Sequence, residues 1–385
     1  MLVAHILAGL AVLSLALTLW QWWVARRFPL HRRVTDGSFT PAVTVLKPLK
    51  GSDAESVRCL QSWLAQEFHG PVQVLFGVAS ANDPVCQTVR SLLPKFPQCD
   101  ARLIVCAQSL GANAKVSTLS QLLPHARHEI IVVSDADVRV PPDFLVNAVE
   151  PLRDGGVGLV HCFYRLANPT TAAMRWEAIA VNADFWSQVL QARSLSPITF
   201  ALGAVMALRR AELEAVGGFA ALADYLADDF QLGRLVARSG KRLELCPVVV
   251  ECWSALMGWR AVWEHQLRWA RTIRVCQPLP WFWSILGNAT WWPLLWWLAQ
   301  PTRDVLLAVL GCLGVRVATA SFHQARLTQA WPAVSALWLV PLKDLLHLLL
   351  WALSFLGGRV NWRGEVYRVQ AGGRLVKLRP AEAGP

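Results

Sequence analysis

Two carboxylates, Asp135 and Asp137, directly follow a short apolar segment and are the first candidates for chemistry. Residues 130–133 are β-branched, which predicts a buried strand. In an open α/β sheet, ligands bind outside the carboxyl ends of the strands, so both acids are expected at a binding rim. Neighbouring carboxylates need a proton or a cation to neutralise them, and a divalent ion held on a nucleotide's phosphates is a common solution. Solvated loop acids or a helix cap are the alternative interpretation.

Two further acidic sites fall at or beyond predicted strand ends. Asp83 follows a predicted strand over 72–78, and Asp228 and Asp229 open a predicted helix. For Asp228, the alternative is a carboxylate that is simply favoured by the positive end of the helix dipole.

A second constellation lies in residues 253–274. Six apolar residues recur there at spacings of three and four, which predicts an amphipathic helix lying on a bilayer: Leu256, Trp259, Trp263, Leu267, Ala270 and Ile273. His265, Arg268 and Trp269 project away from that stripe, toward the domain above it. The alternative is a surface helix whose arginines only meet lipid phosphates.

Composition indicates a membrane protein. The 385 residues are 54% hydrophobic, and 20 Trp stand against 3 Tyr, as expected for side chains that settle at a bilayer interface. The net charge of +11 favours an anionic membrane face and an anionic nucleotide, because no nucleic-acid-binding signature accompanies it. The nine Cys show no C-x-x-C spacing, so reduced thiols without a chemical role are expected.

Short strands and helices alternate from residue 42 onward. The pattern predicts strands over 43–46, 72–78, 102–106 and 130–133, with helices over 53–66 and 84–93 and from the loop 111–115 to residue 123. Strict alternation at this spacing predicts βαβ units, hence an α/β nucleotide-binding domain with a mostly parallel sheet.

Apolar segments flank this domain. Residues 2–23 are long enough to span and are followed by Arg26, Arg27, Arg32 and Arg33, which predicts an uncleaved anchor and a cytoplasmic domain after it. Residues 281–300, 304–320 and 331–356 are three more apolar segments. If all three span, the tail lies opposite the domain, yet its basic residues favour the cytoplasmic side. One segment is therefore expected to be interfacial or re-entrant, and 281–300 is the candidate.

Ionisable residues interrupt the last apolar segment at Lys343, Asp344 and His347. Such residues at membrane depth are functional candidates by default. Two interpretations stay open: they line a slot for the polar head of an acceptor, or they pair with one another at the interface.

Seven motifs, placed as above, span nearly the whole chain: Val45-Leu-Lys-Pro-Leu-Lys-Gly51, Asn82-Asp83-Pro84, Asn113-Ala-Lys115-Val116, Ser134-Asp-Ala-Asp-Val138, Gly158-Leu-Val-His161, Ala227-Asp-Asp-Phe230 and His265-Gln-Leu-Arg-Trp269. With these motifs, the chain resembles the ceramide glucosyltransferase family of the family-2 glycosyltransferase clan. It looks closer still to the bacterial branch associated with hopanoid lipid glycosylation. The end, Asn361-Trp-Arg-Gly with Tyr367-Arg368, is similar to the family's close.

The resemblance implies a GT-A-type nucleotide-sugar-binding domain with a mostly parallel sheet, plus N-terminal and C-terminal transmembrane helices. The expected units are an anchor (1–25), a cytoplasmic catalytic domain (40–250), an amphipathic interface helix (251–280), C-terminal membrane segments (281–358) and a basic tail (359–385). The expected location is a bacterial inner membrane.

The resemblance also implies roles for individual residues. Asp83 would contact the base or ribose of a UDP-sugar, Asp135 and Asp137 would hold its diphosphate through Mg²⁺ or Mn²⁺, and Asn113 and Lys115 would lie at the donor. Asp229 would be the general base, and a covalent nucleophile is the role left open for Asp228. The acceptor-side motif would cover the leaving group through His265, Gln266, Arg268 and Trp269. Family-2 enzymes usually have Gln or Arg where this chain has His265, whereas Asp137 is kept where animal relatives lose it, which favours metal dependence.

The expected function is inverting, non-processive transfer of one sugar, glucose or N-acetylglucosamine, from a UDP-sugar to a hydroxyl of ceramide or a hopanoid polyol in the membrane. A processive polysaccharide synthase of the same clan and a non-catalytic membrane scaffold are the alternatives. No nucleic-acid partner is expected.

Overall fold

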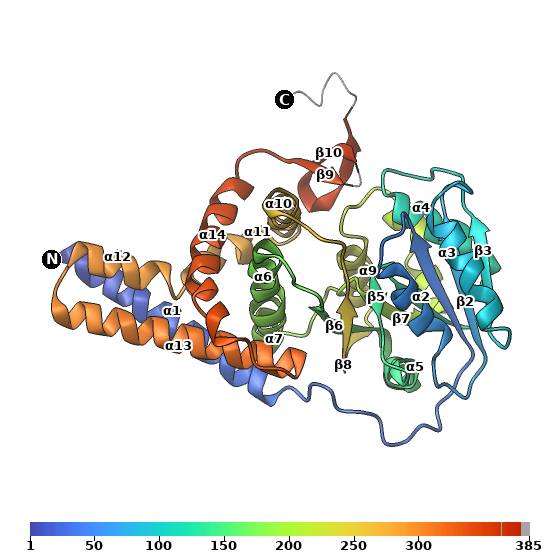
Figure 1. Cartoon of the computed structure of the whole chain (residues 1–385), viewed down its shortest axis with the longest axis horizontal. Coiled ribbons are helices and arrows are strands. Elements are labelled where there is room, and N and C mark those ends of the chain that lie inside the picture. Colours follow the sequence, from blue (N-terminus) through green and yellow to red (C-terminus); the bar gives the residue numbers. More distant parts are fainter. Residues whose placement is uncertain (363, 379–385) are drawn as a thin grey trace.

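The computed structural model describes residues 1–362 and 364–378. An α/β domain forms one end of the molecule and a helical protrusion forms the other (Figure 1). Arg363 and Arg379, which belong to the basic tail, lie outside the described residues.

An eight-stranded mixed sheet, in the order β3-β2-β1-β4-β7-β6-β8-β5, organises the α/β domain. Its strands are β1 (Val43–Leu49), β2 (Val72–Val78), β3 (Asp100–Val105), β4 (Ile130–Ser134), β5 (Val138–Arg139), β6 (Val157–Leu166), β7 (Val205–Arg209) and β8 (Arg242–Cys252). β1, β2, β3 and β4 run parallel, whereas β7 is antiparallel to β4 and to β6. The predicted α/β architecture with a mostly parallel sheet is confirmed.

Helices cover both faces of the sheet. One face packs against α2 (Ser56–Leu64), α3 (Val85–Leu92) and α5 (Phe144–Val149). The other packs against α4 (Ala114–Leu122), α8 (Arg210–Ala215) and α9 (Asp228–Arg238). Short 3₁₀ turns complete the chain: η1 (Leu93–Lys95), η2 (Leu123–His125), η3 (Glu150–Arg153), η5 (Phe219–Leu222), η7 (Val334–Ala336) and η8 (Ala371–Gly373).

Two element boundaries differ from the prediction. The helix expected over 53–66 begins at Ser56, because the Asp53 carboxylate accepts hydrogen bonds from the backbone N–H groups of Glu55 and Ser56 and so forms a turn. The strand expected to end at residue 46 continues to Leu49, because Lys47 is buried and its ammonium group finds oxygen partners on the neighbouring strand β4.

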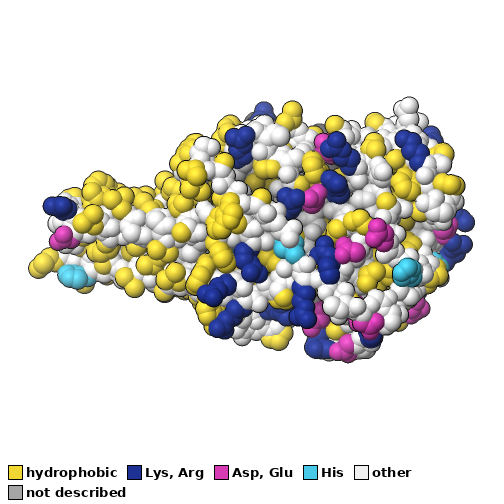
Figure 2. Space-filling view, turned by 60° about the horizontal axis from the view of Figure 1, so that its bottom comes forward, with side chains coloured by type: hydrophobic (Ala, Val, Ile, Leu, Met, Phe, Trp, Pro, Cys, Tyr) yellow, Lys and Arg dark blue, Asp and Glu magenta, His cyan; other side chains and the backbone are white. Residues whose placement is uncertain are grey.

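The protrusion consists of α1 (Leu2–Arg27), α12 (Trp291–Ala299) and α13 (Arg303–Thr328), which contact one another, while α14 (Leu339–Ser354) runs across its base (Figure 1). Three helical segments are long and apolar enough to cross a membrane: Leu2–Arg27, Arg303–Thr328 and Val334–Ser354. Figure 2 shows hydrophobic side chains covering the protrusion, with Lys and Arg gathered where it meets the α/β domain.

The segment expected over 281–300 is not one helix. It breaks into α11 (Pro278–Trp283), η6 (Ser284–Gly287) and α12, and none of these is long enough to span alone. The C-terminal sheet of β9 (Arg359–Trp362), β10 (Glu365–Val369) and β11 (Leu375–Lys377) packs against α10 (Trp259–Cys276) on the α/β side. The described part of the tail therefore lies against the α/β side of the molecule and not against the protrusion.

A buried ionic cluster joins the protrusion to the domain. α6 (Ala172–Ile179), the π-helix η4 (Ala180–Phe185) and α7 (Trp186–Leu195) form a helical arm, and Asp184 of η4 pairs with Arg316 of α13 at 2.9 Å and with Lys343 of α14. Asp344 pairs with Arg316 at 2.8 Å and with Lys343 at 3.2 Å. Lys343 and Asp344 therefore do pair with each other, and they line no open slot, because all four side chains are buried.

Replacing Arg316 tests this cluster. Arg316→Met would leave two buried carboxylates to a single ammonium group, so we expect it to lower the free energy of unfolding by about 3 kcal/mol. Thermal unfolding of the detergent-solubilised protein, followed by circular dichroism, measures the loss. Arg303→Met is the matched control, since Arg303 is exposed on the same helix. Equal melting temperatures for the two variants would contradict the assignment.

Candidate active site

The carboxyl ends of β1 and β4 fix the position of the Asp135-x-Asp137 motif. β4 delivers Asp135 to the rim of the sheet, and Lys47 of β1 holds the backbone there by donating to Ser134 Oγ at 3.1 Å and to the Asp135 carbonyl oxygen at 2.6 Å. Burial lowers the pKa of Lys47 to about 8. The sequence analysis missed this residue, although a lysine inside an apolar strand is a signal for a buried polar partner.

Lys115 joins carboxylates from two separate elements. Its ammonium nitrogen lies 2.8 Å from Asp135 Oδ1 and 3.1 Å from Asp228 Oδ2. Burial alone would lower the pKa of Lys115, but the charges of Asp135 and Asp228 outweigh it and raise that pKa above its ordinary value. Lys115 is therefore charged, and it holds β4, α4 and α9 together at one point.

Asn113 supports Lys115 from within the protein. It is fully buried; its side-chain oxygen caps α4 by accepting from the Val116 N–H at 3.1 Å, and its amide donates to the Tyr225 carbonyl at 2.8 Å and to Asp228 at 3.4 Å. The polar atoms of the side chain are used inside the fold, so Asn113 positions the start of α4, which carries Lys115, and its contact with the donor stays a prediction.

Asp228 and Asp229 open α9 but face different surroundings. Asp228 is buried against Lys115, whereas the partly exposed Asp229 has Gly203 beside it, so that a methyl group at that glycine would lie 2.6 Å from Asp229 Oδ2. Desolvation and the neighbouring charge of Asp228 raise the pKa of Asp229 to about 7. A carboxylate with a pKa near neutrality is suited to accept a proton.

The Asp135-x-Asp137 motif fits a divalent cation. The Asp137 side chain is exposed to solvent on one side and has protein packed around its other sides. The desolvation caused by this protein, together with the charge of Asp135, raises the pKa of the Asp137 carboxyl to about 6. Within residues 1–362 and 364–378, no three His, Cys, Asp or Glu side chains converge as a ready-made metal site. Mg²⁺ and Mn²⁺ accept carboxylate oxygens and complete their shells with water and substrate phosphates, so two acids suffice.

Asp83 occupies the same rim two strands away. Its carboxylate accepts from the Gly51 N–H at 3.0 and 3.1 Å and from the Val85 N–H at 3.0 Å, so it fixes the loop after β1. β1 lies between β2 and β4 in the sheet, so the loop with Asp83 and the acids after β4 follow strands that are two positions apart.

The helix α10 carries the acceptor-side motif, and Glu177 of α6 positions it. The buried Glu177 carboxylate lies 2.6 Å from His265 Nδ1 and accepts from Gln266 Nε2 at 2.8 Å. Gln266 is buried and its amide donates to Glu177, and the expected contact of Gln266 with the donor's diphosphate stays a prediction. The sequence analysis missed Glu177, since 88 residues separate it from His265.

Aromatic rings connect α10 to the carboxylates. Trp269 packs edge-on against Tyr164 of β6 at 6.4 Å and against His265 at 5.1 Å, and Phe185 lies 6.1 Å from it. Burial, together with the charges of Asp229 and both acids after β4, raises the pKa of Tyr164 well above its ordinary value. Arg268, partly buried on the same helix, completes the motif.

The apolar stripe of α10 mostly meets protein. Trp263 and Leu267 pack with Val262 against α6 and α14, and Trp263 stacks on Trp176 at 6.2 Å, so the predicted bilayer-facing stripe is wrong over this stretch. Trp259 at the start of α10 is the stripe residue that keeps a large exposed surface, with 48% of its side chain accessible to solvent. α14, which the sequence pattern could not place, occupies the surface expected for lipid.

Residues 6–375 match glycosyl transferase family 21. The chain belongs to this family. Among similar proteins, ceramide glucosyltransferase 3 of Caenorhabditis elegans is 23% identical over 220 residues, 56% of this chain and 46% of that protein. The ceramide glucosyltransferase of Candida albicans is 30% identical over 125 residues, 30% of this chain and 23% of that protein.

A solved structure shows the same fold. The mannosyltransferase PcManGT from Pyrobaculum calidifontis, in complex with GDP-Man and Mn²⁺, superposes with a TM-score of 0.56 at 22% identity, covering 89% of this chain and 98% of that one. The expected GT-A-type fold is therefore confirmed for this family 21 chain. The chain spans about half the length of the curated relatives it matches, 46% for the nematode protein.

Gly203 supplies a test of the Asp229 geometry in this family 21 chain. Gly203→Ala would push the Asp229 carboxylate aside, so we expect the turnover rate of sugar transfer to fall about 100-fold while the KM for the donor changes little. Steady-state kinetics measure both. Gly37→Ala is the control, because a methyl group there meets nothing within 4 Å. An unchanged turnover rate in Gly203→Ala would refute the close approach.

The pKa of Asp229 makes a second prediction. Since a protonated carboxyl cannot accept a proton, kcat/KM should rise with pH up to about 7 and level off above it, as Asp229 ionises. Rates of transfer measured between pH 5 and 9 give the profile. A profile that is already level at pH 5 would mean that Asp229 is ionised throughout or does not take the proton.

Proposed function

We propose that this chain is an inverting, non-processive glycosyltransferase that moves one sugar, glucose or N-acetylglucosamine, from a UDP-sugar to a hydroxyl of a membrane lipid. The observation that carries the proposal is the pairing, at one sheet rim, of a metal-competent acid pair with a separate carboxylate whose pKa is about 7. Family membership and the relatives named ceramide glucosyltransferase support a lipid acceptor. The proposed acceptor is ceramide or, as in the bacterial hopanoid branch, a hopanoid polyol.

The proposed reaction is a single displacement. The lipid oxygen attacks the anomeric carbon and gives its proton to Asp229, while the bond from that carbon to the diphosphate breaks and its electron pair leaves with the diphosphate. One base on the face opposite the leaving group inverts the anomeric centre. The pairing of Asp228 with Lys115 at 3.1 Å supports Asp229, and not Asp228, as the base.

The second requirement of the proposed reaction is stabilisation of the negative charge that develops on the departing diphosphate. Mg²⁺ or Mn²⁺ held by Asp135 and Asp137 would supply electrostatic stabilisation of the departing diphosphate. Lys115 keeps Asp135 in place, and Arg268 and Trp269, with His265 held by Glu177, lie on the helix proposed to cover the diphosphate. Asp83 is proposed to hold the loop after β1 against the nucleoside.

The proposed location is a membrane, with the catalytic domain on its cytoplasmic side. The protrusion is apolar, and Arg26 and Arg27 follow the first span. We propose the same units as the sequence analysis does: an anchor (1–25), a catalytic domain (40–250), an interface helix (251–280), C-terminal membrane segments (281–358) and a basic tail (359–385).

The test is sugar transfer by the purified, detergent-solubilised protein. Labelled UDP-glucose, UDP-N-acetylglucosamine, UDP-galactose and GDP-mannose would be offered with ceramide, bacteriohopanetetrol or diacylglycerol, in the presence of Mn²⁺ or a chelator. We expect a labelled glycolipid from one UDP-sugar, made only with metal. A long labelled polymer would indicate a processive synthase, and no product from any pairing would indicate a non-catalytic protein.

Asp229→Asn separates catalysis from binding. We expect it to lower transfer by at least about 1,000-fold while UDP binding is unchanged, because the amide keeps the shape of the carboxylate but cannot accept the proton. Glu214→Gln, at an exposed acid on α8, is the control for loss of a negative charge. Transfer that survives in Asp229→Asn would exclude this residue as the base.

A further inference from the structure

The C-terminal sheet docks beside the catalytic carboxylates. The Leu226 N–H donates to the Gly373 carbonyl at 3.0 Å, and the Leu375 N–H donates to the Asp224 carbonyl at 2.7 Å. Leu226, Val360, Tyr367, Val369 and Leu375 form one buried apolar cluster that fixes the sheet on the domain. The segment 224–226 that receives the sheet directly precedes Asp228 and Asp229.

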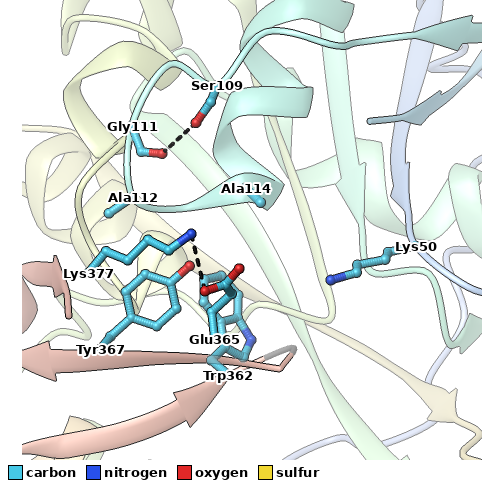
Figure 3. Close-up of a pocket in the computed structure, with 9 residues that line it drawn as sticks. All are labelled: Lys50, Ser109, Gly111, Ala112, Ala114, Trp362, Glu365, Tyr367 and Lys377. Atoms are coloured by element: carbon cyan, nitrogen blue, oxygen red, sulfur yellow. Dashed lines mark hydrogen bonds and ion pairs between the residues drawn. The ribbon is translucent and has the colours of Figure 1, made fainter. Parts of the chain in front are cut away.

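A cavity of about 220 Å³ lies between this sheet and the α/β domain (Figure 3). The domain supplies Lys50 and the loop 109–114, and the sheet supplies Trp362, Glu365, Tyr367 and Lys377. Figure 3 shows Lys50 reaching in from one side, opposite the ring of Trp362 and the carboxylate of Glu365. Glu365 and Lys377 form an ion pair at 3.1 Å.

Chain connectivity places this cavity next to both parts of the candidate active site. Ala114 lines the cavity, and the following residue, Lys115, contacts Asp135 and Asp228. Lys50 lines it as well, and the following Gly51 donates its N–H to Asp83. The cavity therefore lies along the rim that joins the Asp83 loop to the acids after β4.

We propose that the C-terminal sheet is part of the donor site, and that the nucleoside of the sugar donor occupies this cavity with its base against Trp362, while its diphosphate extends past Lys50 toward Asp135 and Asp137. An aromatic face stacks on a nucleobase, a lysine attracts phosphate, and a carboxylate accepts hydrogen bonds from ribose hydroxyls or from a base N–H. Trp362, Lys50 and Glu365 supply these three chemistries in one space. The proposal rests on the proposed function, in which the donor is a nucleotide sugar.

Binding of UDP to the full chain in detergent with MnCl₂, measured by equilibrium dialysis, tests the proposal. We expect Trp362→Ala to weaken binding about tenfold, the loss typical of one base–aromatic stack. The KM for the donor should rise by the same factor, with kcat little changed at saturating donor. Arg368→Ala is the control. Arg368 is exposed on β10, the strand that pairs with the strand β9 that carries Trp362.

A second measurement does not depend on any variant folding. Photolabelling of the wild-type protein with 5-azido-UDP-glucose, followed by peptide mass spectrometry, should give an adduct within residues 359–378. Glu365→Gln should weaken UDP binding with little change in the melting temperature, because Glu365 is exposed at the start of the central strand β10 and its ion pair with Lys377 lies at the surface.

Two outcomes separate this inference from the proposed function. If the wild-type protein binds UDP and transfers sugar, but Trp362→Ala and Glu365→Gln bind UDP as tightly and the label is absent from residues 359–378, the tail inference alone is overturned. If the wild-type protein neither binds UDP nor transfers sugar, both proposals fall.

Discussion

The candidate site depends on the two ion pairs that the ammonium group of Lys115 forms with Asp135 and Asp228. This ammonium group lies within 3.1 Å of carboxylates from β4 and α9, two elements that would otherwise bring like charges together. Placing that lysine requires the loop before α4 to be fixed, and Asp224 fixes it by accepting from the Ala112 N–H at 3.1 Å. The carbonyl of Asp224 also receives the C-terminal strand β11. The tail and the carboxylates are therefore held by one continuous set of hydrogen bonds, although about 150 residues of chain separate them.

The six-residue π-helix η4 connects the membrane end to the same site. π-helical segments are rare and often lie at functional sites, because the wider turn re-aims consecutive side chains. Here Asp184 points into the ionic cluster with Arg316 of α13, and the next residue, Phe185, contacts Trp269 of α10. A displacement of α13 would therefore be transmitted to the Trp269 ring through Asp184 and Phe185, two adjacent residues of the π-helix.

Sequence reasoning located the carboxylates because the ends of parallel strands meet at one rim wherever the strands lie along the chain. Sequence reasoning could not predict the partner of a side chain when that partner is distant along the chain. Nothing local to Asn113 or Gln266 indicates that their amides are used internally by Tyr225 and Glu177. The same limit explains the apolar stripe of α10, since periodicity reports that a face is buried and not whether lipid or α14 covers it. The short strands of the tail carry no periodic signal long enough to predict their docking.

The adjacent acids Asp228 and Asp229 show how one helix start serves two purposes. Successive residues of an α-helix point about 100° apart, so only one of the two can face Lys115. Asp228 takes that direction and is buried, while Asp229 is turned toward the loop of Gly203 and stays partly exposed. The ion pair with Lys115 stabilises the negative charge of the first acid beside the second, and that charge adds to desolvation in raising the pKa of Asp229 to about 7. The buried acid thus adds to the proton affinity of its neighbour, and the order of the pair along the chain determines which of the two faces Lys115 and which is placed for the proposed role of base.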